Sequence, residues 1–381
     1  MPAISAIDAW TCRVPLDAPI RFRWNTITHR DYTVVRLTTD SGVEGSAIAI
    51  SRGLPADLAI VDMLAPAVLG MDALAVADLA GRSRRATAAS DQFGILANAR
   101  SLLDVALWDI RGALLGAPVW RLLGAARDRV GVLLVEGYEL PGESDEQFAR
   151  RLSRRVEEGY PALKLEAAGY DDPAVLRRRL ELIREYAGDD VQLVVDVNGA
   201  WPTVREAAET IRRFATDGIA WVEDPFPQHR LHEVGALRAL VDVPMGAGDD
   251  ITSPRDVMRL AEEDLVDVVR IDALTLGGIS AASDVIATAR QYEKPISTHA
   301  YPGVHQHLSF AWPDTTWIEA FPDDLPFEPS HKLMRSSVFA RIRDGHLDAP
   351  TAPGLDTELD LAAVERYSRR HHRVTLEDVS G

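Results

Sequence analysis

The segment from Gln192 to Asp250 constrains the fold more than any other part of the sequence, because it repeats one short pattern three times. Each copy is an apolar run that ends in a carboxylate: Gln192-Leu-Val-Val-Asp196, Ile219-Ala-Trp-Val-Glu223 and Val243-Pro-Met-Gly-Ala-Gly-Asp249. The acidic residues are 27 and 26 residues apart, and one strand-plus-helix unit takes about 25 residues. The pattern predicts successive parallel strands whose acidic ends share one edge of a barrel, where active sites are built.

Three carboxylates gathered at one sheet edge repel one another unless a cation lies between them. Carboxylate oxygens are the ligands that a hard divalent ion prefers. We therefore predict a Mg²⁺ site formed by Asp196, Glu223 and Asp249. The adjacent Asp250 is an alternative third ligand, although an acid after a strand is often a helix cap.

Length and charge narrow the class of protein. A chain of 381 residues can hold a barrel and a smaller domain, since a barrel takes about 250 residues. The net charge of −17 argues against nucleic acid or an anionic membrane as a partner. Cys12 is the only cysteine, and neither a signal peptide nor a membrane-spanning apolar run is visible. We expect a cytoplasmic enzyme with a small-molecule substrate, and a homo-oligomer.

The strand–turn–helix rhythm of the repeats extends over the middle of the chain. It predicts helices between eight strands, at 132–139, 162–167, 192–198, 219–225, 243–250, 266–273, 295–300 and 316–321. Such alternation indicates an α/β fold with a parallel, closed (β/α)8-type barrel, here a modified (β/α)7β barrel over residues 126–322. Residues 1–125 are predicted to form an α+β capping domain, and residues 323–381 to complete both parts.

The region before the barrel begins with alternating sequence typical of strands, at residues 3–10 and 32–39. Between them we expect a turn-rich loop from Leu16 to Arg30 that carries a cluster of polar and aromatic side chains: Arg21, Phe22, Arg23, Trp24, His29 and Arg30. From Asn98 to Pro118, apolar spacing of three and four residues predicts a long amphipathic helix.

Lysine is rare in this chain, and one lysine occurs where arginine would not serve. Of 41 basic residues only Lys164, Lys294 and Lys332 are lysine. Lys164 lies inside an apolar strand, and a buried lysine, unlike arginine, can lose its proton. We therefore expect a chemical reason for Lys164.

Two features together resemble the mandelate-racemase-like subgroup of the enolase superfamily, over nearly the whole chain. The first is the helix Ser101-Leu-Leu-Asp104-Val-Ala-Leu-Trp108-Asp109-Ile-Arg-Gly112, followed by Leu-Gly-Ala-Pro118 and Leu-Leu-Gly124; by itself it is a packing helix. The second is an ordered set on seven consecutive predicted strands: Lys164, Asp196, Glu223, Asp249, Asp272, His299 and Glu319.

The resemblance implies a role for each member of this set. Asp196, Glu223 and Asp249 match the three Mg²⁺ ligands, and His299 with Asp272 matches the acid/base pair. Glu319 matches a carboxylic acid that donates to the substrate's carboxylate. The Leu276-Gly-Gly-Ile279 turn and the Pro353-Gly-Leu-Asp356 segment fit the same family. The chemistry has its own logic, because a proton α to a carboxylate can be removed near pH 7 only if Mg²⁺, Lys164 and Glu319 stabilise the enediolate.

Two positions depart from the family pattern. The third ligand is usually Glu, whereas here it is Asp249, one methylene shorter. The second strand usually ends Lys-x-Lys but here reads Lys164-Leu-Glu166, with both side chains on one face. Glu166 either pairs with Lys164 or a loop arginine, contacts a substrate hydroxyl, or acts as a second base.

Without the second lysine, His299 is the one conventional acid/base catalyst, and it suits β-elimination of water from a sugar acid. The expected enzyme is an acid-sugar dehydratase that makes a 2-keto-3-deoxy acid. Arg21, Arg23, His29 and Arg52, beside Arg30, are the candidate substrate-binding residues for a polyhydroxylated or dianionic acid, unless they form a solvated surface. The alternatives are a racemase, epimerase or lactone cycloisomerase that uses Glu166, and a non-catalytic protein that retains the fold.

Overall fold

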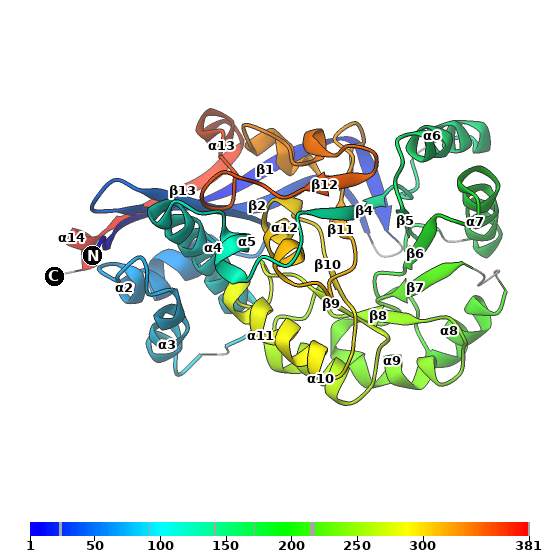
Figure 1. Cartoon of the computed structure of the whole chain (residues 1–381), viewed down its shortest axis with the longest axis horizontal. Helices are drawn as coiled ribbons and strands as arrows, with labels where there is room; N and C mark the ends of the chain where they lie inside the picture. Colours follow the sequence, from blue (N-terminus) through cyan, green and yellow to red (C-terminus); the bar gives the residue numbers. More distant parts are fainter. Residues whose placement is uncertain (23–24, 91, 141, 171, 214–217, 380–381) are drawn as a thin grey trace.

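A computed structural model describes residues 1–22, 25–90, 92–140, 142–170, 172–213 and 218–379. Two parts lie side by side: a cap, built around a long antiparallel sheet, and a barrel of parallel strands with helices around it (Figure 1). None of the described helices is long and apolar enough to cross a membrane.

The barrel contains the eight predicted strands in their predicted order. They are β4 (Arg129–Val135), β5 (Ala162–Glu166), β6 (Gln192–Asp196), β7 (Ile219–Glu223), β8 (Met245–Ala247), β9 (Val268–Ile271), β10 (Ile296–Thr298) and β11 (Ile318–Ala320). From β4 to β10 each strand pairs in parallel with the next along the chain, and β11 pairs with β4. The backbone of Ile296, the first residue of β10, bonds to Asp314 and Thr316 before β11, so the ring of strands is nearly closed.

Seven helices follow the first seven strands and cover the outside of the barrel, which gives the predicted (β/α)7β order within the described residues. They are α6 (Asp145–Glu157), α7 (Pro173–Ala187), α8 (Val204–Ile211), α9 (Leu231–Arg238), α10 (Pro254–Glu262), α11 (Gly278–Gln291) and α12 (Pro302–Ala311). Side chains cap several of their first turns: Ser144, Asp172, Thr203 and Ser253 each accept a backbone N–H.

The inside of the barrel is layered, because strand side chains alternate between faces. A small apolar cluster of Leu133, Ala162, Val194, Trp221 and Val268 fills its lower part. Two residues further along four of these strands, on the same face, come Lys164, Asp196, Glu223 and Arg270. The apolar layer therefore supports a charged one.

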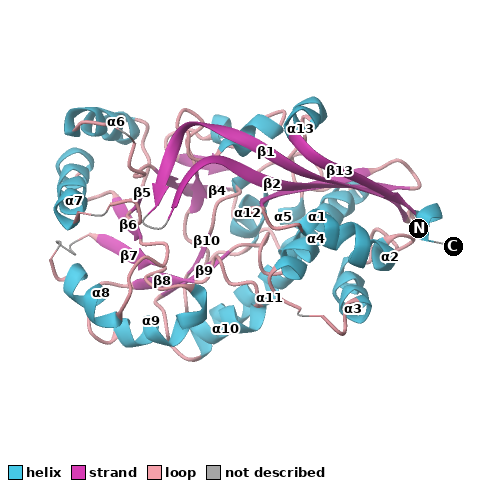
Figure 2. Cartoon of the chain, turned by 180° about the vertical axis from the view of Figure 1, so that it is seen from behind, coloured by secondary structure: helices cyan, strands magenta, loops and turns pink. Residues whose placement is uncertain are grey.

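The cap sheet has the order β13-β1-β2-β3, formed by β1 (Ile4–Phe22), β2 (Asn25–Thr39), β3 (Glu44–Ile50) and β13 (Ser368–Thr375). The prediction of a turn-rich loop from Leu16 to Arg30 is wrong. Apart from the undescribed 23–24, these residues extend both strands into a long ribbon that reaches over the barrel (Figure 2). Residues 16–30 lack the apolar alternation by which strands are predicted, because one face of the ribbon is exposed and the other lines a cavity.

The helices of the cap are α1 (Ala56–Leu58), η1 (Ala59–Leu64), α2 (Ala65–Val68), α3 (Val76–Ala86), α4 (Ile95–Leu115) and α5 (Val119–Leu123). After the barrel come η3 (Pro329–Leu333), η4 (Phe339–Arg341), β12 (His346–Asp348), α13 (Leu361–Tyr367), β13 and α14 (Leu376–Val379). β12 pairs with β4 and β13 with β1, so this segment contacts both the barrel and the cap.

The predicted helix signature of α4 explains how the cap is fixed to the barrel. Asp104 accepts hydrogen bonds from the backbone N–H (3.1 Å) and hydroxyl (2.6 Å) of Ser280 at the start of α11. Asp109 accepts the backbone N–H groups of Ser46 (3.0 Å) and Leu355 (2.8 Å). A Cβ on Gly278 would lie 2.2 Å from Asp104, so the Gly-Gly turn is needed for this close approach.

Candidate active site

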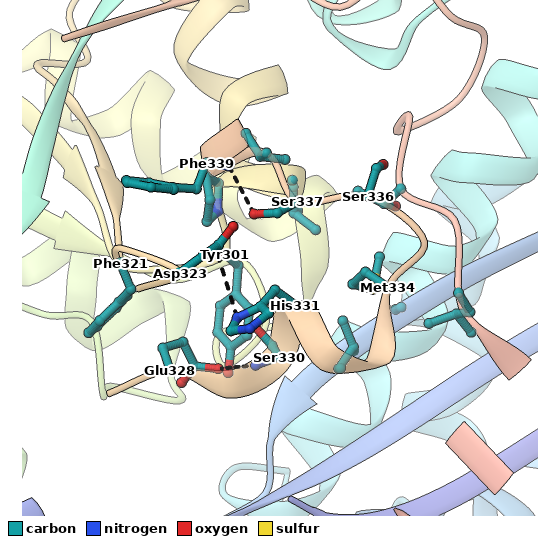
Figure 3. A pocket seen from close by; sticks show the side chains of 18 of the residues that line it. Tyr301, Phe321, Asp323, Glu328, Ser330, His331, Met334, Ser336, Ser337 and Phe339 are labelled. Carbon is teal, nitrogen blue, oxygen red and sulfur yellow. Dashed lines mark hydrogen bonds and ion pairs between the residues drawn. The ribbon is translucent and has the colours of Figure 1, made fainter. Parts of the chain in front are cut away.

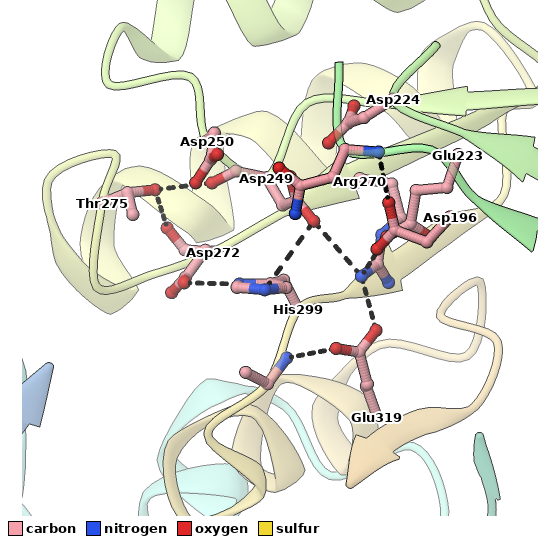
Figure 4. Close-up of polar contacts among 12 residues, drawn as sticks. Asp196, Glu223, Asp224, Asp249, Asp250, Arg270, Asp272, Thr275, His299 and Glu319 are labelled. Carbon is pink, nitrogen blue, oxygen red and sulfur yellow. Dashed lines mark hydrogen bonds and ion pairs between the residues drawn. The ribbon is translucent and has the colours of Figure 1, made fainter. Parts of the chain in front are cut away.

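The strand-end residues predicted from the sequence come together at the carboxyl edge of the barrel (Figure 4). Lys164 is buried there, and its Nζ lies 2.9 Å from Asp196 Oδ2, 2.5 Å from Glu223 Oε1 and 3.0 Å from Glu319 Oε2. Glu166, Asp196 and Glu223 are register partners on β5, β6 and β7. One lysine thus faces three carboxylates from different strands.

Arg270, which the sequence analysis missed, is a second cation at the centre of this cluster. It is fully buried on β9, and its Nη2 lies 2.6 Å from Glu319 Oε2, 3.0 Å from Glu223 Oε1 and 3.4 Å from Asp249 Oδ2. Its Nη1 donates to Ser297 Oγ (2.6 Å) and to the carbonyl of Thr298 (2.8 Å). The alternation of strand side chains could have identified Arg270, because it lies two residues before Asp272 and therefore on the same face of the strand.

The remaining contacts of the three predicted metal ligands hold them in place. Asp196 Oδ1 accepts the backbone N–H of Asn198 at 2.9 Å, and Glu223 Oε2 accepts the indole N–H of Trp221 at 2.9 Å. Burial raises the pKa of Glu223 to about 7, although the charges of Arg270 and Lys164 oppose the shift. Removing these groups from water therefore disfavours full ionisation of the cluster.

In the present side-chain positions, no three acidic, histidine or cysteine side chains of the described residues are close enough together to hold a metal ion. Lys164 and Arg270 lie between the carboxylates instead. The composition of the cluster nevertheless fits a divalent ion. Asp196, Glu223, Asp249 and Glu319 carry four potential negative charges against two cations, and all their donors are oxygens.

His299 and Asp272 form the predicted pair. His299 Nδ1 lies 3.0 Å from Asp272 Oδ2, while Nε2 faces the cluster 4.0 Å from Asp249 Oδ2. Burial opposes the charged ring, but Asp249, Asp272 and Glu319 outweigh it and raise the pKa of His299 to about 9. Asp272 is fixed in turn by the backbone N–H of Leu274, 2.7 Å from Oδ1.

A second histidine, His305, supports this pair and was not predicted. Its Nε2 accepts the N–H of Ala273 at 3.0 Å, and its Nδ1 contacts the carbonyl of Ala300 at 2.7 Å. Burial lowers the pKa of His305, so the neutral ring joins the ends of β9 and β10.

The surroundings of Glu319 and Glu166 differ from the expectations. Glu319 was expected as a carboxylic acid donor, yet Lys164, Arg270 and His299 outweigh burial and lower its pKa to about 2, so it is ionised here. For Glu166 the sequence left three roles open, one of them an ion pair with Lys164. In the structure its Oε1 accepts the N–H of Ala168 at 2.9 Å instead. Burial, and secondly Asp196, raise the pKa of Glu166 well above its usual value.

Asp249 and Asp250, the alternative ligands, face different surroundings. Asp249 is buried with the cluster, whereas Asp250 forms a two-pronged ion pair with Arg52 of the cap, at 2.7 and 2.9 Å. Backbone residues with positive φ lie around this rim: Arg52 (50°), Asn198 (48°), Asp224 (41°), Ala300 (48°) and Tyr301 (41°). Such strained conformations are typical of functional sites.

A cavity of about 500 Å³ lies between the ribbon of the cap and the barrel edge. Of the predicted substrate-binding residues, His29 and Arg52 line it, as do Arg30 and the catalytic candidate His299; Arg21 is not among its lining residues, and Arg23 lies outside the described residues. A cavity of this size suits a small polar ligand. Phe321 and Glu328 also line a second cavity of about 90 Å³ next to η3 (Figure 3).

Two family models match the chain and between them span most of it. Residues 6–124 match the mandelate racemase / muconate lactonizing enzyme N-terminal domain, and residues 147–363 match the enolase C-terminal domain-like family. The chain belongs to the enolase superfamily, in its mandelate racemase-like subgroup. This superfamily member has the predicted arrangement of barrel and cap.

Its relatives include enzymes with different reactions. An L-talarate/galactarate dehydratase of Salmonella typhimurium is 30% identical over 93% of this chain and 86% of its own length. Muconate cycloisomerase 1 of Rhodococcus opacus is 27% identical over 96% and 99%. Among solved structures, L-talarate dehydratase from Polaromonas sp. JS666, complexed with Mg and L-glucarate, superposes with a TM-score of 0.87 at 27% identity, covering 98% of this chain and 100% of that one.

Proposed function

We propose that this superfamily member is an acid-sugar dehydratase, which removes the proton α to the carboxylate of a sugar acid and expels the β-hydroxyl as water. The observation that carries the proposal is the His299–Asp272 pair, whose free Nε2 faces the buried cluster of carboxylates and cations. The dehydratases among the relatives support it.

Asp196, Glu223 and Asp249 would hold Mg²⁺, as the Mg-bound structural relatives suggest. The bound ion would draw electron density from the substrate's carboxylate and so make its α-proton more acidic. Lys164 places its ammonium beside the same carboxylates and offsets negative charge as the enediolate forms. Glu319 would lie next to the incoming carboxylate, whose charge favours the protonated, donating form of Glu319.

His299 carries the proton through both steps. Nε2 takes the proton from Cα, and the same N–H then protonates the β-hydroxyl as the Cβ–O bond breaks, releasing water and an enol that becomes the 2-keto-3-deoxy acid. Asp272 holds Nδ1 and supports the charged ring between the two transfers. Because Asp249 contributes to the raised pKa of His299, sharing its charge with the ion would bring that pKa towards neutrality.

Glu166 supports a second candidate function, that of a racemase, epimerase or lactone cycloisomerase that acts through the same enediolate intermediate. Its raised pKa favours this candidate, because a protonated Glu166 could return a proton to Cα. The cycloisomerase and epimerase among the relatives are consistent with it.

A library of sugar acids with Mg²⁺ in D₂O tests the proposal. A dehydratase should produce a 2-keto acid and show little epimerised substrate, and His299→Asn should lose both α-proton exchange and elimination while still folding. Exchange into one epimer without 2-keto acid, lost in Glu166→Gln, would replace the dehydratase with an epimerase. A library that shows no exchange at all would refute both enzymes.

A further inference from the structure

The wall of the 500 Å³ cavity opposite the charged cluster bears on what the far end of the substrate can be. The reasoning rests on the proposed function, in which the substrate's carboxylate lies at the cluster beside Lys164. The rest of the carbon chain then points towards the cap, where Asn25–Asp31, Ile50, Arg52 and Glu328 line the cavity.

Arg30 is the most deeply placed cation of this wall, and its surroundings already neutralise it. Its Nε donates to the carbonyl of Phe327 at 3.2 Å and lies 4.0 Å from Glu328 Oε2, with both side chains largely buried. The other oxygen of Glu328 accepts the Tyr32 hydroxyl and the N–H of Ser330. Glu328 is thus held in place as the counter-charge of Arg30.

The other two basic side chains of the wall have carboxylates of their own. Arg52 is bound through two nitrogens by Asp250. His29 Nε2 lies 3.6 Å from Asp31 Oδ2, and Asp31 also binds Arg13 at 2.7 and 2.9 Å. Among the described residues that line the cavity, each basic side chain therefore faces a carboxylate.

A second substrate carboxylate would meet an unfavourable wall. It would lose water on entering the cavity and would compete with Glu328, Asp31 or Asp250 for a cation already paired. A hydroxyl both donates and accepts, so it can bind to these carboxylates and to Asn25, Thr26 and Thr28 without displacing any of them. Phe22, Ile27, Ile50 and Phe321 add apolar surface for the C–H groups of a carbon chain.

We propose that the substrate is a sugar acid with a single carboxylate and an uncharged polyol end, and that Glu328 is a specificity-determining residue that disfavours the corresponding diacids. The relatives include enzymes named for acids of each kind, such as D-gluconate dehydratase and L-talarate/galactarate dehydratase, so similarity alone does not decide between them.

The test compares pairs of acids of matched configuration, such as D-gluconate with D-glucarate and D-galactonate with galactarate, on the full chain with Mg²⁺. The 2-keto acid formed and the deuterium exchanged from D₂O give kcat/KM for each. We expect the monoacid of the preferred pair to exceed its diacid by at least about 100-fold. An equal or better diacid overturns the inference and leaves the dehydratase standing, whichever cation binds the second carboxylate, Arg21 and Arg23 included. No turnover of either class overturns the proposed function and the inference with it.

The variant Glu328→Gln tests whether Glu328 determines the preference for a monoacid over a diacid. The amide keeps an acceptor for Tyr32 but removes the charge, so the wall gains one net positive charge. The diacid-to-monoacid ratio of kcat/KM should rise about tenfold or more. Glu158→Gln, which removes a similar charge at the end of α6 beside Arg155, is the matched control and should leave the ratio unchanged. A ratio that responds equally in both variants would show that Glu328 does not set the choice.

Discussion

Asp249 and Asp250 are neighbours in sequence, yet only Asp249 faces Arg270 and His299, while Asp250 binds Arg52 of the cap. We therefore expect Asp249→Asn to weaken Mg²⁺ binding by at least about 100-fold, because an expected ligand loses its charge. Asp250→Asn should leave the Mg²⁺ affinity close to that of the wild type. Isothermal titration of Mg²⁺ into each protein measures the difference, and the reverse order of affinities would exchange the two assignments.

Arg270 neutralises carboxylates that the expected Mg²⁺ would also neutralise. We therefore expect the stability of Arg270→Met to depend on Mg²⁺. Arg270→Met removes the cation that faces Glu223, Asp249 and Glu319 together, and Lys164 remains beside Glu223 and Glu319. The metal-free variant should lose about 3–5 kcal/mol of unfolding free energy, the usual effect of breaking a buried ion pair.

Mg²⁺ should then raise the melting temperature of Arg270→Met more than that of the wild type, because the ion replaces part of the missing charge. Thermal melts with and without Mg²⁺ measure both shifts. Arg290→Met, which breaks an exposed pair with Asp314, serves as the control. Equal shifts in all three proteins would mean that Arg270 acts by packing alone.

Much of the site could be predicted residue by residue, because each predicted residue lies in a predicted strand or directly after it: Lys164, Asp196, Glu223, His299 and Glu319. Their protonation could not, since it depends on which charges face one another across the barrel. Glu319 was expected as a carboxylic acid, whereas its ion-pair partners lower its pKa to about 2, and burial raises the pKa of Glu166 well above its usual value. The metal and catalytic roles themselves stay predictions.

At the scale of elements, α4 joins motifs that are far apart in the sequence. Asp104 binds Ser280 just after the Gly-Gly turn at the start of α11, and Asp109 binds the Pro-Gly-Leu-Asp segment near residue 354. The sequence identified all three motifs and interpreted α4 as a packing helix, but it could not show that they contact one another. The long ribbon of β1 and β2 was missed because cavity-lining polar residues there replace the apolar alternation by which strands are recognised.

Burial raises the pKa of Asp104 to about 7, although Ser280 donates to it, and this predicts a pH-dependent stability. Between about pH 4, the unfolded value, and pH 7 the folded protein keeps a proton that the unfolded chain has lost. The unfolding free energy should therefore fall as pH rises through this window, by up to about 4 kcal/mol, and level off above it.

Asp104→Asn should flatten this part of the curve. Urea unfolding of both proteins at pH 5 and pH 8 measures it. Asp109, whose pKa burial raises to about 6, remains in both proteins, so the difference between them isolates Asp104. Parallel curves for the two proteins would contradict the prediction.

At the scale of the whole molecule, the two ends of the chain meet in the cap sheet. β13 pairs with β1, and Arg370 of β13 binds the fully buried Asp57 of α1 at 2.8 and 2.9 Å. Arg370→Leu removes the arginine that binds Asp57 and leaves the more distant His372 Nε2, 3.7 Å away, so the unfolding free energy should fall by roughly 2–3 kcal/mol, less than for a fully buried pair because Arg370 is partly exposed.

Hydrogen exchange locates that loss: amides of β1 and β13 should exchange faster, while those of β5–β7 in the barrel should not change. Arg369→Leu, on the same strand and without an ion pair to a described carboxylate, is the control and should be close to neutral. Uniformly faster exchange in cap and barrel would show that the two parts unfold as one unit.

The pairing of β13 with β1 also sets the order in which the protein can be assembled during synthesis. From β4 to β10 each barrel strand pairs with the next along the chain and so finds that neighbour within one repeat; β11 pairs with β4 instead. The partner of residues 6–12 is residues 368–375, which are made only after the whole barrel. Until then β1 has an open edge that other chains could pair with, and the late, non-local pairing is expected to be slow. The cap is therefore begun before the barrel is made and is completed only after it.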